Sequence, residues 1–118
     1  MSDQQNAAVV DRLVQAYNAG DMDAFLGCFA DGAKIFRGRD EVAFDGKEAI
    51  RAEYEQQFSK GYKNNPGDRI VVGRHIAERE RVTGGDGGGE TDFLTIYTVE
   101  NDRIVRVDFL GAEVTAKT

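Results

Sequence analysis

The sequence has few of the residues from which disulfides and metal sites are built. It contains one cysteine, one histidine, one proline and no tryptophan. A single cysteine excludes an intrachain disulfide, and the apolar neighbours Phe25 and Phe29 indicate that Cys28 is a buried apolar residue. A single histidine argues against a zinc site, because such sites need several His or Cys ligands. We therefore expect no metal and no other cofactor.

Long apolar runs and an excess of positive charge are also absent. No segment approaches the roughly 20 apolar residues that cross a bilayer, and the opening residues, MSDQQNAAVVDR, lack the basic start and apolar stretch of a secretion signal. We therefore expect a cytoplasmic protein with no membrane partner. The net charge of −6 and the pI near 4.7 would repel a phosphate backbone, which argues against a nucleic-acid partner.

What the sequence does contain is enough for one folded unit. Its 118 residues, 41% of them hydrophobic and 31% charged, indicate a single domain over 1–118 with one core. Apolar residues recur at helical spacing in the first half and in strand-like runs after Pro66. We therefore expect an α+β fold in which the helices come first.

Three helices and a short strand pair are predicted in the first half. The first helix covers about 6–18, Gly20 ends it, and Asp21 is a suitable N-cap for a short second helix. Strands at 33–37 and 41–44 follow. A third helix extends to about residue 59, and the spacing of Asp45 and Glu48 predicts a capping box at its start. The apolar positions behind these helices are Val10, Leu13, Val14, Tyr17, Met22, Phe25, Leu26, Phe29, Ile50, Tyr54 and Phe58.

Three long β-type segments are predicted in the second half, at 69–83, 90–100 and 103–114, after a loop at 60–68. They are rich in Val, Ile, Thr and aromatic residues. The connections GGDGGG and NDR are short, which predicts an antiparallel meander. The glycine-rich connection joins two strands and no helix begins after it, so a mobile hairpin tip is favoured over a phosphate-binding loop.

Three segments, in this order, resemble the nuclear transport factor 2-like superfamily, which includes the SnoaL-like proteins. They are YNAGDMDAFLGCFADGAKI, FDGKEAIRAEYEQQF and VENDRIVRVDFL, which are similar to the family's helix pair, third helix and final hairpin. The resemblance implies a cone-shaped curved antiparallel sheet wrapped around three helices of the N-terminal half, a cystatin-like roll. It also implies a homodimer through the back of the sheet, and the apolar residues on both alternating faces of 93–99 agree with this.

The resemblance further implies an enclosed pocket, open at one end, that binds a small apolar or aromatic molecule. Helical periodicity explains Tyr17 and Tyr54 equally well as core residues. The residues that we expect at the pocket are all aromatic: Tyr17, Phe25, Phe29, Tyr54, Phe58 and Tyr97.

Two catalytic patterns of the superfamily are incomplete in this chain. Ketosteroid isomerases need a tyrosine and two carboxyl groups at positions that here hold Leu13, Arg37 and Thr95, so the standard isomerase mechanism is not expected. The limonene epoxide hydrolase pattern places an arginine between two aspartates. Arg79 and Asp108 are similar in position, but Arg81 stands where the second aspartate belongs.

The best catalytic candidate is Asp108, because SnoaL-like polyketide cyclases use an aspartate on the final strand as acid and base. In that hypothesis Asp108 removes a proton next to a carbonyl, and Arg79, His75 or a tyrosine stabilises the oxyanion. If the apolar face formed by Val105, Val107 and Phe109 is the core face, however, Asp108 points away and pairs with an arginine such as Arg106. His75 can equally be a structural residue, and a non-catalytic ligand-binding or dimerisation module remains the alternative.

Overall fold

The computed structural model describes residues 2–38, 40–85 and 88–115. The first helix, α1 (Asp3–Ala19), begins at a capping box in which Ser2 accepts from the Gln5 N–H at 3.1 Å and the Gln5 side chain accepts from the Ser2 N–H at 2.8 Å. It therefore starts three residues earlier than the apolar spacing predicts. One face of α1 is buried, at Asn6, Val9, Val10, Leu13, Val14, Ala16 and Tyr17.

The helix-to-helix turn has the predicted caps. Gly20 ends α1 in the left-handed conformation, with φ of 68°, which glycine adopts without steric cost. The Asp21 carboxylate accepts from the Ala24 N–H at 3.1 Å and so caps α2 (Met22–Gly27). The chain then continues directly into β1 (Phe29–Arg37), which β2 (Glu41–Asp45) follows.

The predicted capping box at the third helix is wrong. Before α3 (Lys47–Ser59) the N-cap is Gly46, and no side chain bonds to the first turn. Asp45 is the last residue of β2 and pairs with Lys34 of β1, while the Gly46 N–H donates to the Ala33 carbonyl at 2.8 Å. The strand pairing therefore keeps Asp45 away from the helix end.

The segment 69–83 is two strands and not one, and the predicted loop at 60–68 belongs mostly to the first of them. The strands are β3 (Lys63–Val72) and β4 (His75–Thr83), which pair antiparallel around a turn at Gly73, where φ is 57°. Pro66 is tolerated inside β3 because β3 lies at the edge of the sheet. The start of β3 is fixed by Asn18 of α1, which bonds to both backbone polar groups of Asn64.

The last two strands, β5 (Glu90–Glu100) and β6 (Arg103–Thr115), complete the predicted meander. Asn101 and Asp102 form the turn between them, both with positive φ, as in a tight hairpin. The glycine-rich connection at 84–89 joins β4 to β5, and its residues 86 and 87 lie outside the described residues. The sheet has the order β2-β1-β6-β5-β4-β3, with β1 parallel to β6 and every other neighbouring pair antiparallel.

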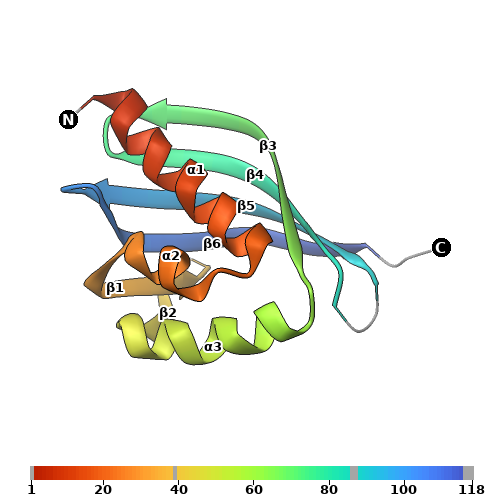
Figure 1. Cartoon of the computed structure of the whole chain (residues 1–118). Coiled ribbons are helices and arrows are strands. Elements are labelled where there is room, and N and C mark those ends of the chain that lie inside the picture. Colours follow the sequence, from red (N-terminus) through yellow and green to blue (C-terminus); the bar gives the residue numbers. More distant parts are fainter. Residues whose placement is uncertain (1, 39, 86–87, 116–118) are drawn as a thin grey trace.

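The three helices cover one face of this curved sheet, as predicted (Figure 1). The helix α1 packs on β3, β4, β5 and β6, and α3 packs on β1 and β2. Residues at alternate positions of β4 and β5, such as Ile76 and Tyr97, are buried beneath the helices. On the other face the side chains of Ile70, Val72 and Leu94 are exposed. In the part of the chain that the structure describes, no helix is long and apolar enough to cross a membrane.

Candidate functional site

A cavity of about 380 Å³ lies between the helices and the sheet face that they cover. Aromatic and aliphatic side chains form most of its wall, and the exposed residues Arg37, Gln56 and Lys60 lie at its mouth. The helices contribute Leu13, Val14, Tyr17, Phe25, Glu53, Tyr54 and Gln57; the sheet contributes Phe29, Phe44, Asn64, Glu80, Val82, Thr91, Phe93, Tyr97, Val107 and Phe109; and Tyr62 lies between α3 and β3.

The aromatic wall is centred on Phe25. Its ring centroid lies 4.6 Å from that of Tyr54, 5.3 Å from that of Phe29 and 6.1 Å from that of Tyr17. These four residues and Tyr97, all expected at the pocket from the sequence, do line it. Phe58 instead packs against the ring of Phe25 at 5.4 Å. Such a wall suits a flat apolar or aromatic ligand.

One acidic side chain, Glu80 of β4, is buried in the sheet wall of this cavity. Glu80 is only 1% exposed, and its carboxyl oxygens accept from the Thr95 hydroxyl at 2.9 Å and from the Tyr97 hydroxyl at 2.7 Å. Burial, and a hydrogen bond with the neighbouring carboxyl group of Glu78, raise the pKa of Glu80 to about 8. A carboxyl group with such a pKa exchanges a proton near neutral pH.

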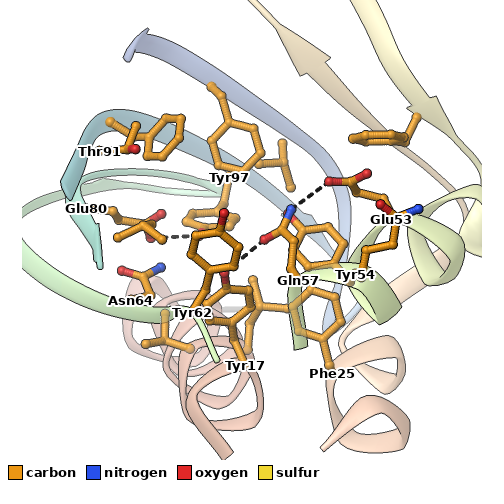
Figure 2. A pocket seen from close by; sticks show the side chains of 18 of the residues that line it. Tyr17, Phe25, Glu53, Tyr54, Gln57, Tyr62, Asn64, Glu80, Thr91 and Tyr97 are labelled. Carbon is orange, nitrogen blue, oxygen red and sulfur yellow. Dashed lines mark hydrogen bonds between the residues drawn. The ribbon is translucent and has the colours of Figure 1, made fainter. Parts of the chain in front are cut away.

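A second hydrogen-bonded chain crosses the helix side of the cavity. The Tyr17 hydroxyl donates to Gln57 Oε1 at 2.9 Å, and Gln57 Nε2 donates to Glu53 Oε2 at 2.9 Å. Burial raises the pKa of Tyr17 well above its usual value, so its phenol is neutral. Figure 2 shows Glu80 and Asn64 on one side of the pocket and Glu53 on the other. The cavity is therefore polar at two separate places.

Comparison with known proteins identifies the family of this chain. The family model of the SnoaL-like domain matches residues 10–107. The chain belongs to the SnoaL-like family. No curated protein matches it.

Solved structures with the nuclear transport factor 2-like fold superimpose on this SnoaL-like chain. An uncharacterised cystatin-fold protein from Novosphingobium aromaticivorans is 27% identical, with a TM-score of 0.80 over 90% of this chain and 97% of the other. A proposed polyketide cyclase from Sinorhizobium meliloti is 21% identical, with a TM-score of 0.76 over 92% and 99%. A computationally designed binder of 17-OHP is 18% identical, with a TM-score of 0.82 over 94% and 97%.

Asp108, the acid and base expected from the SnoaL-like resemblance, lies on the sheet face away from the cavity. Its carboxylate accepts from Nε and Nη2 of Arg106, both at 2.9 Å. The neighbouring Val107 and Phe109 point into the cavity, because successive side chains of a strand alternate between faces. The apolar face of β6 that contains Val107 and Phe109 is therefore the core face. The expectation that Asp108 lies in the pocket is wrong.

The two residues expected to assist Asp108 also lie on the outer face, and they are not together. Arg79 is paired with Asp92, with Nη2 2.7 Å from Oδ2, and its side chain is 59% exposed. His75 is exposed at the start of β4 and lies 3.4 Å from the Thr98 hydroxyl. Neither residue lines the cavity. In the described part of the chain, no group of three or more His, Cys, Asp or Glu side chains could hold a metal ion.

The sequence reasoning missed Glu80, although a signal for it was present. In β4 the side chains of Glu78 and Glu80 alternate with those of His75, Arg79 and Arg81, so they share the face of Ile76. The resemblance to SnoaL-like polyketide cyclases instead favoured Asp108, with Arg79 and His75, and these three residues lie on the outer face. Two acidic residues on an apolar strand face are unusual enough to mark a site, because buried carboxylates need partners.

The positions at which an isomerase carries its catalytic groups nevertheless lie at this site. Leu13 and Arg37 line the cavity, and Thr95 donates to Glu80. A carboxyl group, that of Glu80, lies beside Thr95 on the neighbouring strand β4. Its location differs from the isomerase pattern, but it reaches the same wall of the cavity.

Proposed function

We propose that this protein binds a small, largely aromatic or apolar molecule that carries a carbonyl or hydroxyl oxygen, and that Glu80 gives or takes a proton there. The observation that carries the proposal is a buried carboxyl group with a raised pKa in the wall of a mostly apolar cavity. A volume of about 380 Å³ lies within the roughly 300–1,000 Å³ of small-molecule sites. The designed 17-OHP binder and the proposed polyketide cyclase support ligands of this kind on this fold.

The chemistry that fits is proton transfer without a cofactor. In its charged form Glu80 removes a proton from the carbon next to a carbonyl, which leaves an enolate. Glu80 then returns a proton to carbon or oxygen, and in D₂O its carboxyl proton exchanges for deuterium before that return. Figure 2 shows Tyr62 and the Asn64 amide on the same side as Glu80, where their donors can face the enolate oxygen. Glu80 thus takes the role that the sequence reasoning gave to Asp108.

The bicyclic ketone 2-tetralone tests binding and chemistry together. We expect it to raise the melting temperature of the wild-type protein, since a ligand at 100 times its dissociation constant adds about 2.7 kcal/mol of stability. In D₂O the protein should accelerate deuterium incorporation next to the carbonyl, measured by NMR. Glu80→Gln should keep the thermal shift and lower the exchange rate about 10²- to 10⁴-fold.

The matched control is Asp108→Asn, which removes a carboxylate from the outer face and should leave the exchange rate unchanged. If Glu80→Gln exchanges as fast as the wild type, Glu80 is not the acid and base. If 2-tetralone binds to both proteins and neither accelerates exchange, the non-catalytic alternative, a ligand-binding module, replaces the enzyme.

We also propose that two copies of the chain associate through the outer face of the sheet. Ile70, Val72 and Leu94 are 67%, 68% and 44% exposed there. Arginine and aspartate side chains lie among them, in the pairs Arg79–Asp92 and Arg106–Asp108. A surface that carries both positive and negative side chains can be complementary to a second copy of itself when the two copies are related by a two-fold axis.

Light scattering after gel filtration tests this association. The wild-type protein should have twice the 13.0 kDa mass of one chain. The variant Leu94→Glu should have the mass of one chain, because association would bury an unpaired charge at the contact. Ala52→Glu, on the exposed side of α3, is the control and should leave the mass unchanged. A monomeric wild-type protein at micromolar concentration would refute the proposal.

A further inference from the structure

A second carboxyl group, Glu78, is buried beside Glu80 and takes no proton-transfer step of its own in the chemistry described above. Both residues are 1% exposed, and they lie two positions apart on the same face of β4. Two ionised carboxylates that are neighbours on one strand face in an apolar interior repel each other strongly. Their other contacts decide which of them carries the negative charge.

Among the residues that the structure describes, Glu78 forms an ion pair and Glu80 does not. Its Oε2 accepts from Nε of Arg69, on β3, at 2.6 Å, and Arg69 Nη2 in turn lies 2.8 Å from Oδ1 of Asp11, on α1. The other oxygen, Oε1 of Glu78, is buried and has no hydrogen-bond partner among the described groups if both carboxyl groups are ionised. A proton on Glu80 can supply that partner, because the two buried side chains project side by side from the same face of β4.

The groups that face Glu80 from the other elements do not neutralise a charge on it. Tyr17 of α1, Tyr54 of α3 and Tyr97 of β5 are buried, and burial raises the pKa of each, so they are neutral phenols. Thr95 is a neutral donor, and Glu53 of α3 adds a further negative charge on the helix side. Arg69 reaches Glu78 and Asp11 and so is shared between two carboxylates.

We propose that Glu78 is the positioning residue that keeps a proton on Glu80: Arg69 holds the negative charge on Glu78, and Glu78 accepts a hydrogen bond from the protonated carboxyl group of Glu80. The sheet wall of the pocket is then uncharged at neutral pH, and the ligand group that faces Glu80 is an uncharged oxygen, as in a ketone, and not a carboxylate. The inferred chemistry of the ligand rests on the proposed function. The proton on Glu80 and its hydrogen bond to Glu78 do not depend on it.

The proton is measured directly by NMR on protein labelled with ¹³C at the glutamate carboxyl carbons, with the two signals assigned from Glu78→Gln and Glu80→Gln. We expect Glu80 of the wild-type protein to titrate with a midpoint near 8. Glu78→Gln removes the negative neighbour, and its amide N–H favours the charged form of Glu80, so the midpoint should fall by about two pH units or more. Glu55→Gln, an exposed glutamate of α3 that does not line the cavity, is the matched control and should leave the midpoint in place.

A second variant, Glu78→Asp, covers the case in which Glu78→Gln does not fold. It keeps the charge but withdraws the acceptor by one methylene group, and the midpoint of Glu80 should fall here as well. A midpoint that stays near 8 in both variants, or a wild-type Glu80 that titrates near 4.5, overturns the proposal. Because no ligand is present, the result is independent of the 2-tetralone experiment. A pocket that fails to bind the ketone but shows the shifted titration rejects only the proposed function.

Discussion

Substitution of Phe25 by alanine is expected to lower the free energy of unfolding by about 3–5 kcal/mol, as for other fully buried phenylalanines. Phe25 is 2% exposed, and its ring contacts those of Tyr17, Phe29, Tyr54 and Phe58. It is also one of only two buried residues of the six-residue helix α2. A helix this short is not stable by itself, so the ring holds it against the core.

Urea unfolding followed by circular dichroism measures this loss, and Phe36→Ala is the matched control. Phe36 is the same residue type on the outer face, where it is partly exposed and lies under the Arg106 guanidinium, 3.7 Å from the ring centroid. Its removal should cost clearly less. The loss at Phe25 is a large part of the 5–15 kcal/mol of an ordinary domain. Equal losses in the two variants would show that Phe25 is not the centre of the aromatic wall.

Local features of the fold could be predicted because the residues that set them are close in sequence. The caps at Gly20 and Asp21 and the turn at 101–103 are examples, since each depends on a backbone conformation that those residues adopt. The turn at Gly73 was not predicted. It lies in a run of β-formers, VVGRHI, and only the pairing of β3 with β4 identifies it as a turn.

The site was harder to predict because it depends on which face of the sheet the helices cover. Strand alternation correctly separates Glu80 from Arg79, and Asp108 from Val107. Alternation alone does not determine which of the two sets of side chains points toward the helices when both faces of a strand carry apolar residues. The register across β4, β5 and β6 groups the residues by face, since it aligns Glu80 with Phe93 and Asp108 with Ile96. The packing of the helices on the sheet then decides which face is the inner one. Such pairing joins residues that are far apart in the sequence.

Removal of the Arg69 charge by Arg69→Met is expected to destabilise the protein by about 3–5 kcal/mol near pH 8, because it leaves a buried carboxylate without its partner. The size of the loss should depend on pH. Below about pH 8, Glu80 takes up a proton, so less negative charge is buried beside the unpaired Glu78 carboxylate. At pH 5 we therefore expect a clearly smaller loss than at pH 8.

The free energy of unfolding of the wild-type protein should also decrease as the pH rises, but by less. The pKa of Glu80 is raised from 4.5 to about 8 in the folded state, so the folded state binds more protons than the unfolded state between these values. Stability from this group is therefore fully present below about pH 4.5 and is lost as the pH rises through about 8. Urea unfolding at pH 5, 6, 7, 8 and 9 measures both proteins.

Arg74→Met is the matched control, because Arg74 is an exposed arginine whose Nη1 lies 3.4 Å from Glu100 Oε2. A surface pair of this kind contributes about 0–1 kcal/mol, so its loss should be small at every pH. The double variant Arg69→Met, Glu78→Gln should recover most of the stability, because it removes the unpaired charge together with its cation. A loss at Arg69 that is independent of pH and is not recovered by Glu78→Gln would mean that Arg69 acts only through Asp11, as a link between β3 and α1.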